Sequence, residues 1–204
     1  MSSDIAWGSS LEDALQRAYS EDKRVLLYFS AAPMRGGCAR LDAEVYPEPR
    51  VVRFIGEEFV PVEVHVRNQA EEFKRLGSRY GVQWTPTELV IDPSGVERHR
   101  VEGFLPVQDF LAQLELGLAQ AEFAQSKFAE AERRYREVVK GYPETEAAPE
   151  ALYWAGVARY KASGDSGALS QTAKQFQERY QNSSWGKKAS VWAQPAQTAA
   201  SAPH

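Results

Sequence analysis

The sequence predicts two connected parts: an α/β region with a mixed sheet covered by helices, and an all-helical region after it. Up to residue 105, segments with helical periodicity alternate with short apolar or alternating segments, in the order αβαβαββα. From Pro106 onward no strand pattern recurs, and alanine, glutamate, glutamine and aromatic residues repeat at helical spacing. This change of pattern is what separates the two parts.

The composition is that of a globular protein. With 43% hydrophobic and 25% charged residues, the 204-residue chain has enough apolar side chains for a core. The net charge is −4 and basic residues are scattered among acidic ones, so neither nucleic acid nor a membrane surface is an expected partner. The chain has no apolar run of membrane-spanning length and no N-terminal pattern of a secretion signal. The single cysteine cannot form an intrachain disulfide, which favours the cytoplasm.

The first four elements follow from capping and apolar spacing. A helix is predicted to begin near Ser10, where SSLEDALQRAYSED combines serine caps, early acidic residues and apolar residues at helical spacing. RVLLYFS is an unbroken apolar run, which is typical of a strand buried on both faces. After a loop with two glycines, CARLDAEVY is predicted to be helical. EPRVVRFIGEEF is predicted to form a second short helix, with Pro49 near its first turn.

The next elements complete the α/β region. FVPVEVHV alternates, which places Val60, Val62, Val64 and Val66 on one face of a strand. AEEFKRLGSRYG is predicted to be a helix that ends at Gly81. TELVID and VERHRVEG, joined by the turn residues DPSG, are predicted to form a hairpin. The long helix VQDFLAQLELGLAQAEFAQSK is then expected to connect the α/β region to the helical one.

The helical region contains an internal repeat with an offset of 38 residues, which aligns YPETEAAPEALYW with YQNSSWGKKASVW. The shared positions are Tyr142 with Tyr180, Ala151 with Ala189, and Trp154 with Trp192. In each copy a helix is predicted before the tyrosine and another after the spacer. The low-complexity end, AQPAQTAASAPH, is predicted to be disordered. The expected parts are therefore residues 1–110, 111–193 and 194–204.

Residues 1–110 resemble the thioredoxin fold, and in particular bacterial thioredoxin-like domains. The likeness is carried by VLLYFSA, GGCARLD, WTPTELVID and VEGFLPVQDFLAQL. It implies a mixed sheet flanked by helices, with a cis peptide bond before Pro86 that faces the redox loop. It also implies a groove in which an extended peptide pairs with backbone groups. The candidate groove residues are Met34, Arg35, Gly36, Gly37, Trp84, Thr85, Pro86 and Gly103.

The redox loop departs from the pattern of that family, Trp-Cys-x-x-Cys. Cys38 takes the place of the second cysteine, whereas Met34 or Arg35, depending on the alignment, stands where the nucleophilic first cysteine belongs. The buried acid of the family is missing from LLYF, and its neighbouring lysine aligns with Glu63. Ordinary dithiol oxidoreductase activity is therefore not expected, and the resemblance implies no cofactor.

Cys38 leaves two interpretations open. It is either an inert residue packed under the loop, or a lone thiol whose pKa is lowered by the helix N-terminus and Arg35. The second interpretation makes the protein a monothiol oxidoreductase or a thiol-based redox sensor. A metal site is not expected, because His65, His99 and His204 show no ligand spacing and there is no second cysteine.

FAEAERRYREVVKGYPETEAAPEALYWAGVARY resembles tetratricopeptide repeats, with small and aromatic residues at the positions where paired helices meet. The resemblance implies that the helical region binds a protein or peptide partner; the alternative is a stabilising or dimerising extension. The candidate contacts are Arg133, Tyr153 and Lys161. The leading functional hypothesis is a redox-inactive interaction protein, either a scaffold or chaperone-like, in which the helical region contributes more binding than the loop.

Overall fold

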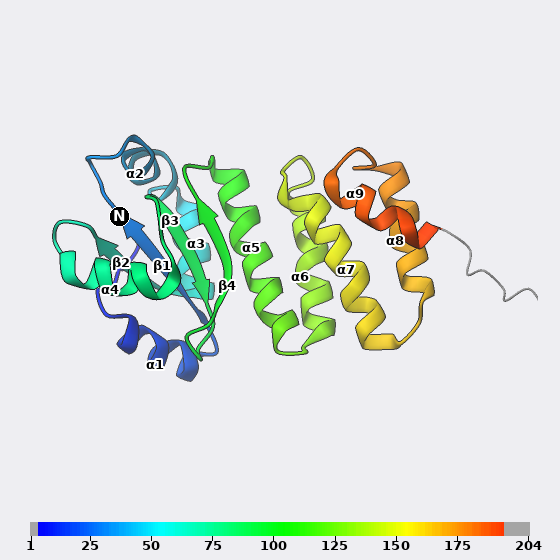
Figure 1. The fold of residues 1–204 in the computed structure, drawn as a ribbon, viewed down its shortest axis with the longest axis horizontal. Coiled ribbons are helices and arrows are strands. Elements are labelled where there is room, and N and C mark those ends of the chain that lie inside the picture. Colours follow the sequence, from blue (N-terminus) through cyan, green and yellow to red (C-terminus); the bar gives the residue numbers. More distant parts are fainter. Residues whose placement is uncertain (1–3, 194–204) are drawn as a thin grey trace, which may run out of the picture.

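The computed structural model describes residues 4–193, so the predicted disordered tail lies outside the described residues. The α/β part contains α1 (Leu11–Glu21), β1 (Arg24–Ser30), α2 (Gly36–Arg40), the π-helical segment η1 (Leu41–Val45), α3 (Pro49–Glu58), β2 (Phe59–His65), α4 (Ala70–Tyr80), β3 (Thr87–Ile91) and β4 (Glu97–Glu102). The helical part contains α5 (Val107–Ala124), α6 (Phe128–Gly141), α7 (Ala147–Ser163), α8 (Gly167–Glu178), α9 (Ser184–Ala189) and the 3₁₀ segment η2 (Ser190–Ala193). Figure 1 shows the two parts side by side, with α5 between them.

The sheet is mixed, as the sequence predicts, and has the strand order β2-β1-β3-β4. Strand β1 runs parallel to β2 and antiparallel to β3, and β4 pairs antiparallel with β3. In this register Tyr28 of β1 lies between Glu63 of β2 and Glu88 of β3. The sheet therefore places two carboxylates beside one tyrosine, although the three residues are far apart in the sequence.

Helices cover both faces of the sheet, which explains the unbroken apolar run of β1. Leu26 and Tyr28 point to a core completed by η1, α3 and α5, whereas Val25, Leu27 and Phe29 point to a core completed by α1 and α4. All seven residues of β1 are buried. A strand with helices on both sides needs apolar residues at every position rather than at every second one.

Helix α5 belongs to both parts of the protein, as the sequence predicts for this segment. Its Phe110, Leu114 and Leu118 pack into the core under the sheet, whereas Ala112 and Leu116 pack into the core of the helical part. The predicted division between residues 110 and 111 therefore lies inside a single helix. Because this helix contributes side chains to two cores, the two parts share a rigid element rather than a flexible linker.

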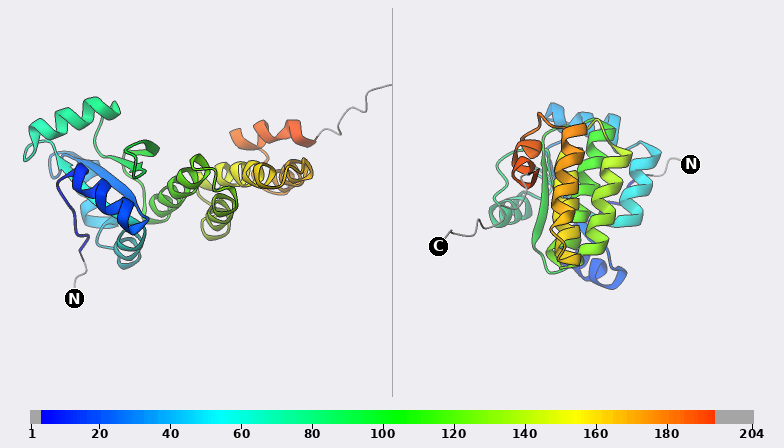
Figure 2. Two further views of the ribbon diagram at one scale, coloured as in Figure 1. Left: turned by 90° about the horizontal axis from the view of Figure 1, so that it is seen from below. Right: turned by 90° about the vertical axis from the view of Figure 1, so that its right-hand side faces the viewer.

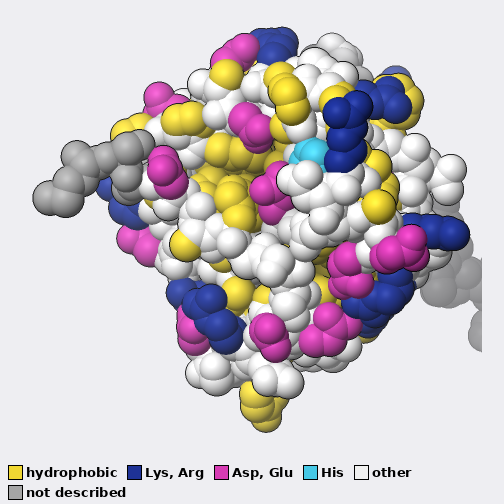
Figure 3. Space-filling model, turned by 90° about the vertical axis from the view of Figure 1, so that its left-hand side faces the viewer, with side chains coloured by type: hydrophobic (Ala, Val, Ile, Leu, Met, Phe, Trp, Pro, Cys, Tyr) yellow, Lys and Arg dark blue, Asp and Glu magenta, His cyan; other side chains and the backbone are white. Residues whose placement is uncertain are grey.

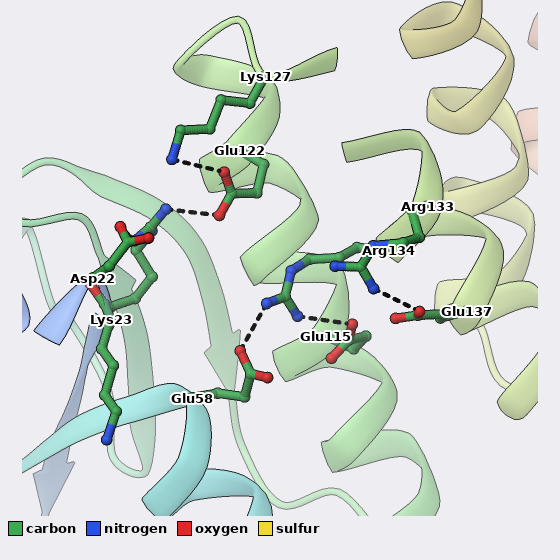
Figure 4. Close-up of polar contacts among 10 residues, drawn as sticks. Asp22, Lys23, Glu58, Glu115, Glu122, Lys127, Arg133, Arg134 and Glu137 are labelled. Carbon is green, nitrogen blue, oxygen red and sulfur yellow. Dashed lines mark hydrogen bonds and ion pairs between the residues drawn. The ribbon is translucent and has the colours of Figure 1, made fainter. Parts of the chain in front are cut away.

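Ion pairs also join the two parts (Figure 4). Arg134 of α6, which is partly buried, binds Glu58 of α3 at 2.8 Å and Glu115 of α5 at 3.1 Å. At the other end of α5, Arg24 of β1 binds Glu122 at 2.8 Å, and the Arg24 side chain is only 3% exposed. Removing Glu122 is therefore expected to be costly, because the buried Arg24 charge would lose its partner.

The helical part consists of packed hairpins. Helix α6 packs on α5 and α7, and α7 packs on α8, so that their axes lie side by side (Figure 2). The internal repeat corresponds to the pairs α6–α7 and α8–α9: Tyr142 and Tyr180 follow the first helix of each pair, and Ala151 and Ala189 are buried in the second. Helix α9 has only six residues, so the second copy is shorter.

Two boundaries differ from the sequence prediction. The helix expected over CARLDAEVY begins two residues earlier, at Gly36, and it divides into α2 and the wider turn of η1. The strand predicted over FVPVEVHV ends one residue earlier, at His65, so Val66 lies outside β2. Within residues 4–193, no helix combines the length and the apolar character needed to cross a bilayer.

Candidate functional site

The loop between β1 and α2 is a compact turn at one end of the sheet. The backbone amides of Met34 and Arg35 donate to the Ala31 carbonyl at 2.9 and 3.3 Å, and the peptide bond before Pro33 is cis. This turn leaves Arg35 exposed and the Met34 side chain 39% exposed. The residues that stand where the family has its first cysteine are therefore open to solvent.

The loop contacts Pro86, whose cis peptide bond the family resemblance implies and the structure confirms. Gly37 lies so close to this proline that a Cβ atom at residue 37 would be 2.9 Å from Pro86 Cδ. The Gly103 amide donates to the Pro86 carbonyl at 2.9 Å, and Gly103 has a φ of 88°, which favours glycine. The structure thus brings the loop, residues 84–86 and Gly103 together, as the resemblance implies.

A groove of about 410 Å³ opens beside the loop. It is lined by Ala31, Met34, Arg35, Val66, Arg67, Phe73, Val82, Gln83, Trp84 and Thr85. Figure 3 views this end of the molecule, where Lys and Arg side chains lie beside the one visible histidine; the hydrophobic hollow in that view is bordered by acidic side chains and is separate from the groove. The Trp84 side chain is 57% exposed, and the Arg35 guanidinium lies 4.9 Å from its ring centroid. Four of the eight predicted groove residues are among those that line it, whereas Gly36, Gly37, Pro86 and Gly103 are not. The sequence did not point to the other six lining residues, which include Phe73 of α4 and Val82 of the following loop.

Cys38 is inaccessible in this structure. It is 0% exposed, and its Sγ accepts a hydrogen bond from the Ala31 amide at 3.4 Å. The Arg35 side chain, which one interpretation of the sequence places as an activating charge, instead lies over Trp84. The geometry matches a thiol packed under the loop, and a reaction of this thiol requires the loop to move.

The structure holds a buried acid that sequence reasoning did not find. The segment LLYF of β1 contains no acid, but Glu88 of β3 lies directly beside Tyr28 and is 1% exposed. The Tyr46 hydroxyl donates to Glu88 Oε1 at 2.9 Å, and Oε2 has no partner among the described residues. Burial raises the Glu88 pKa to about 8, so this carboxyl is largely protonated at neutral pH.

Glu88 and Cys38 both lie near Tyr28. Burial is the main reason that the pKa of Tyr28 is raised; the Ser30 side chain opposes this effect, and the charges of Cys38, Asp42 and Glu88 add to it. The buried acid of this protein therefore lies on the strand next to β1. The signal in the sequence is a glutamate inside TELVI, a segment whose other residues are suited to a buried strand.

The three candidate contacts of the helical part lie in different surroundings. Arg133 of α6 is exposed and binds Glu137 one turn later at 2.7 Å. Lys161 is exposed near the end of α7. Tyr153 is partly buried and stacks on Trp192, with 4.5 Å between the ring centroids. Tyr153 therefore belongs to an aromatic cluster that joins the two hairpins, whereas Arg133 and Lys161 are free to meet solvent.

The comparisons with known proteins agree with this architecture. Residues 11–118, just over half of the chain, match the family model for a thioredoxin-like domain. The chain belongs to the thioredoxin-like family. This thioredoxin-like protein is 26% identical over 110 residues to the thioredoxin-related protein DsbJ of Chlamydia pneumoniae, and the match spans 50% of this chain but only 32% of that protein.

Two solved structures share the fold. The DsbH oxidoreductase superposes with a TM-score of 0.51 at 20% identity, which covers 56% of this chain and 85% of that one. A putative disulphide-isomerase from Bacteroides thetaiotaomicron superposes with a TM-score of 0.50 at 28% identity, covering 58% and 96% of the two chains. These matches show the thioredoxin fold of the α/β part, while the tetratricopeptide character of the helical part stays a prediction.

Proposed function

We propose that this thioredoxin-like protein is a non-enzymatic interaction module that holds an extended segment of a partner protein in the groove beside Trp84. The observation that carries the proposal is the contrast between the groove beside Trp84 and the thiol of Cys38. The groove is open and presents Trp84 and Met34 to solvent, whereas the single thiol is fully buried. The groove is therefore accessible to a peptide, whereas the Cys38 thiol, which would have to react with it, is buried under the loop.

The composition of the groove indicates what it binds. Its aromatic and aliphatic side chains favour apolar residues, because each Å² of apolar surface removed from water contributes about 25 cal/mol. Two arginines, Arg35 and Arg67, line it, and no carboxylate is among the residues that do so. An apolar segment with a neighbouring acidic residue suits this surface, since opposite charges at the edge of an interface improve specificity and association rate.

Thiol–disulfide exchange is not supported by the same geometry. Exchange begins when a thiolate attacks a disulfide sulfur, so the attacking sulfur must be reachable. Neither Met34 nor Arg35 carries a thiol, and Cys38 Sγ lies under the loop with the Ala31 amide as its partner. The alternative, a monothiol oxidoreductase or sensor, therefore needs a second conformation of the loop.

The helical part supplies a second contact surface in this proposal, and we expect it to contribute more binding than the groove. Between α6, α7 and α8 lies a cavity of about 470 Å³, with Val139, Leu152 and Tyr180 among its apolar residues. Arg136, Lys140 and Arg179 also line it, together with one acidic residue, Glu178. A partner with apolar and acidic residues would thus meet apolar surface and an excess of positive charge on both parts of the protein.

The test uses a fluorescently labelled, unfolded polypeptide without cysteine, with binding followed by anisotropy. Trp84→Ala should weaken binding about tenfold, equal to about 1.4 kcal/mol. Tyr19→Ala removes an aromatic side chain that is 81% exposed on α1, outside the groove, and should bind like the wild type. Cys38→Ser should also bind normally. Equal binding by the Trp84 and Tyr19 variants would refute the groove as a binding site.

Two further measurements separate the alternatives. The wild-type protein should not accelerate insulin reduction in a turbidity assay. Activity that is present in the wild type and disappears in Cys38→Ser would instead show that the protein is a monothiol oxidoreductase. Charge reversal at Arg136 and Arg179 in the cavity of the helical part, or at Arg133 and Lys161 on its surface, should weaken binding more than Trp84→Ala if the helical part dominates. If all of these reversals leave binding unchanged, the helical part is a stabilising or dimerising extension.

A further inference from the structure

His65 is the last residue of β2 and joins two segments at the end of the sheet. In the parallel ladder its partner is Ser30, the last residue of β1. The chain after β1 forms the loop that covers the thiol, and the chain after β2 forms the turn that leads into α4. Both segments line the groove: the loop supplies Ala31, Met34 and Arg35, and the turn supplies Val66 and Arg67.

The contacts of the His65 ring fix its protonation state. Its Nε2 atom lies 2.6 Å from the Ala32 carbonyl oxygen, and its Nδ1 atom lies 3.2 and 3.3 Å from the backbone amides of Arg67 and Asn68. A carbonyl oxygen only accepts a hydrogen bond and an amide N–H only donates one, so Nε2 carries the proton and Nδ1 is the acceptor. The ring is therefore neutral in this arrangement, and it ties the loop to the turn.

The bond to Ala32 holds the start of the loop in place over Cys38. The Ala32 amide donates to Ser30 Oγ at 3.2 Å, and the preceding amide, that of Ala31, donates to Cys38 Sγ at 3.4 Å. Cys38 is fully buried beneath these contacts. A displacement of Ala32 away from His65 would therefore disturb both the cover of the thiol and the adjoining wall of the groove.

A second proton on the ring is incompatible with its contacts in the turn. An imidazolium carries an N–H group at both nitrogens, so Nδ1 would point a hydrogen at the amide hydrogens of Arg67 and Asn68. Both hydrogen bonds would be lost. Histidine is the side chain whose charge ordinarily changes between about pH 5 and 8, and the half-buried ring of His65 is open to solvent protons. The tied arrangement thus binds the added proton less well than one in which the ring has left the turn.

The charged groups around the ring act in the same direction. Partial burial raises the pKa of the Asp42 carboxyl, the charge of Glu63 raises it further, and His65 opposes these effects. Asp42 of η1 therefore attracts an imidazolium, although solvent weakens this attraction because Asp42 is exposed. Arg67, whose amide contacts the ring, carries a positive charge that disfavours an imidazolium held in the turn.

We infer that His65 is a pH-sensitive latch, which ties the loop to the turn when it is neutral and releases the loop over Cys38 when it is protonated. A proton shifts such an equilibrium because it binds the two states with different affinity. Mild acid should therefore expose the thiol and loosen the wall of the groove. The consequence for partner binding rests on the proposed function, whereas the release of the loop does not.

Labelling of Cys38 in the full-length protein tests the latch, with an aromatic disulfide reagent that reacts in mild acid, at about pH 5.5 and pH 7.5. His65→Gln keeps an N–H donor that reaches Ala32 but does not titrate, and it should stay closed at both pH values. The wild type should match this variant at the higher pH and label about tenfold faster at the lower one. Comparing the two proteins at one pH cancels the effect of pH on the thiol itself.

His65→Asn keeps an acceptor for the two amides but is too short to reach Ala32, so it should label fast at both pH values. His99→Gln changes the histidine between β4 and α5, which binds Gln113, and should keep the wild-type response. Circular dichroism at each pH shows that the proteins stay folded. Labelling that is equally slow in wild type and His65→Gln at the lower pH, or a slow His65→Asn variant, would overturn the inference. Because labelling needs no partner, its result is independent of the Trp84 test of the proposed function.

Discussion

Replacing Glu88 with glutamine should stabilise the protein at neutral pH, with little effect under mildly acidic conditions. Burial raises the Glu88 pKa from 4.5 to about 8 in the folded protein. In the unfolded chain the carboxyl returns to its ordinary pKa, so folding between these two values requires the uptake of a proton. This contribution to stability is fully present below the unfolded pKa and is lost as the pH rises towards the folded one.

The magnitude follows from the size of the shift. One pKa unit corresponds to about 1.4 kcal/mol, so Glu88 should reduce the free energy of unfolding by roughly 2–3 kcal/mol between pH 5 and pH 7. Glutamine keeps the oxygen that accepts the Tyr46 hydroxyl and never ionises. The variant should therefore lie within about 1 kcal/mol of the wild type at pH 5 and exceed it by roughly 3 kcal/mol at pH 7.

Urea unfolding followed by tryptophan fluorescence at pH 5, 6, 7 and 8 measures this difference. Glu115 also titrates in this range, because burial raises its pKa to about 7 despite the opposing charge of Arg134. The difference between wild type and Glu88→Gln cancels the contribution of Glu115. Glu48→Gln, at an exposed position, is the control. A difference between wild type and Glu88→Gln that does not change with pH would show that Glu88 has the same pKa in both states.

Three further predictions concern the thiol, the helix packing and the shared helix. Cys38 should react slowly with a disulfide reagent in the native protein and rapidly after denaturation, because it is 0% exposed; equally fast native labelling would contradict its burial. Gly156→Ala should destabilise the protein by about 1–3 kcal/mol, since the new Cβ would lie 2.8 Å from Thr172 Cβ, whereas Gly56→Ala meets open space and should stabilise by about 0.5–1 kcal/mol in thermal unfolding. A chain truncated after Gly103 should show no cooperative unfolding by circular dichroism, and a cooperative transition would mean that α5 is dispensable to the sheet.

Much of the fold is determined by local sequence patterns. The unbroken run of β1, the alternation of β2, and Gly81 at the end of α4 each follow from the side-chain period or from backbone conformation. The same is true of the position of α5, whose apolar residues face in two directions. These features depend on neighbours within about one or two turns or along one strand, which is the range over which sequence patterns are informative.

The groove was partly predictable from the sequence. The family resemblance placed eight residues in it; Met34, Arg35, Trp84 and Thr85 do line the cavity, whereas Gly36, Gly37, Pro86 and Gly103 do not. The burial of Cys38 could not be decided, because the helix N-terminus and the apolar surroundings have opposite effects on a thiol, and only packing shows which surroundings it has.

The tertiary structure alone decided the position of the buried acid. Glu88 becomes the acid beside Tyr28 because β3 pairs with β1 in one particular register, and a shift of one residue would turn it to the other face. Its hydrogen bond with Tyr46 joins residues that are 42 positions apart in the sequence. Contacts between residues so distant in the sequence leave no local periodicity, so they are set only when the strands pair and the helices close over them.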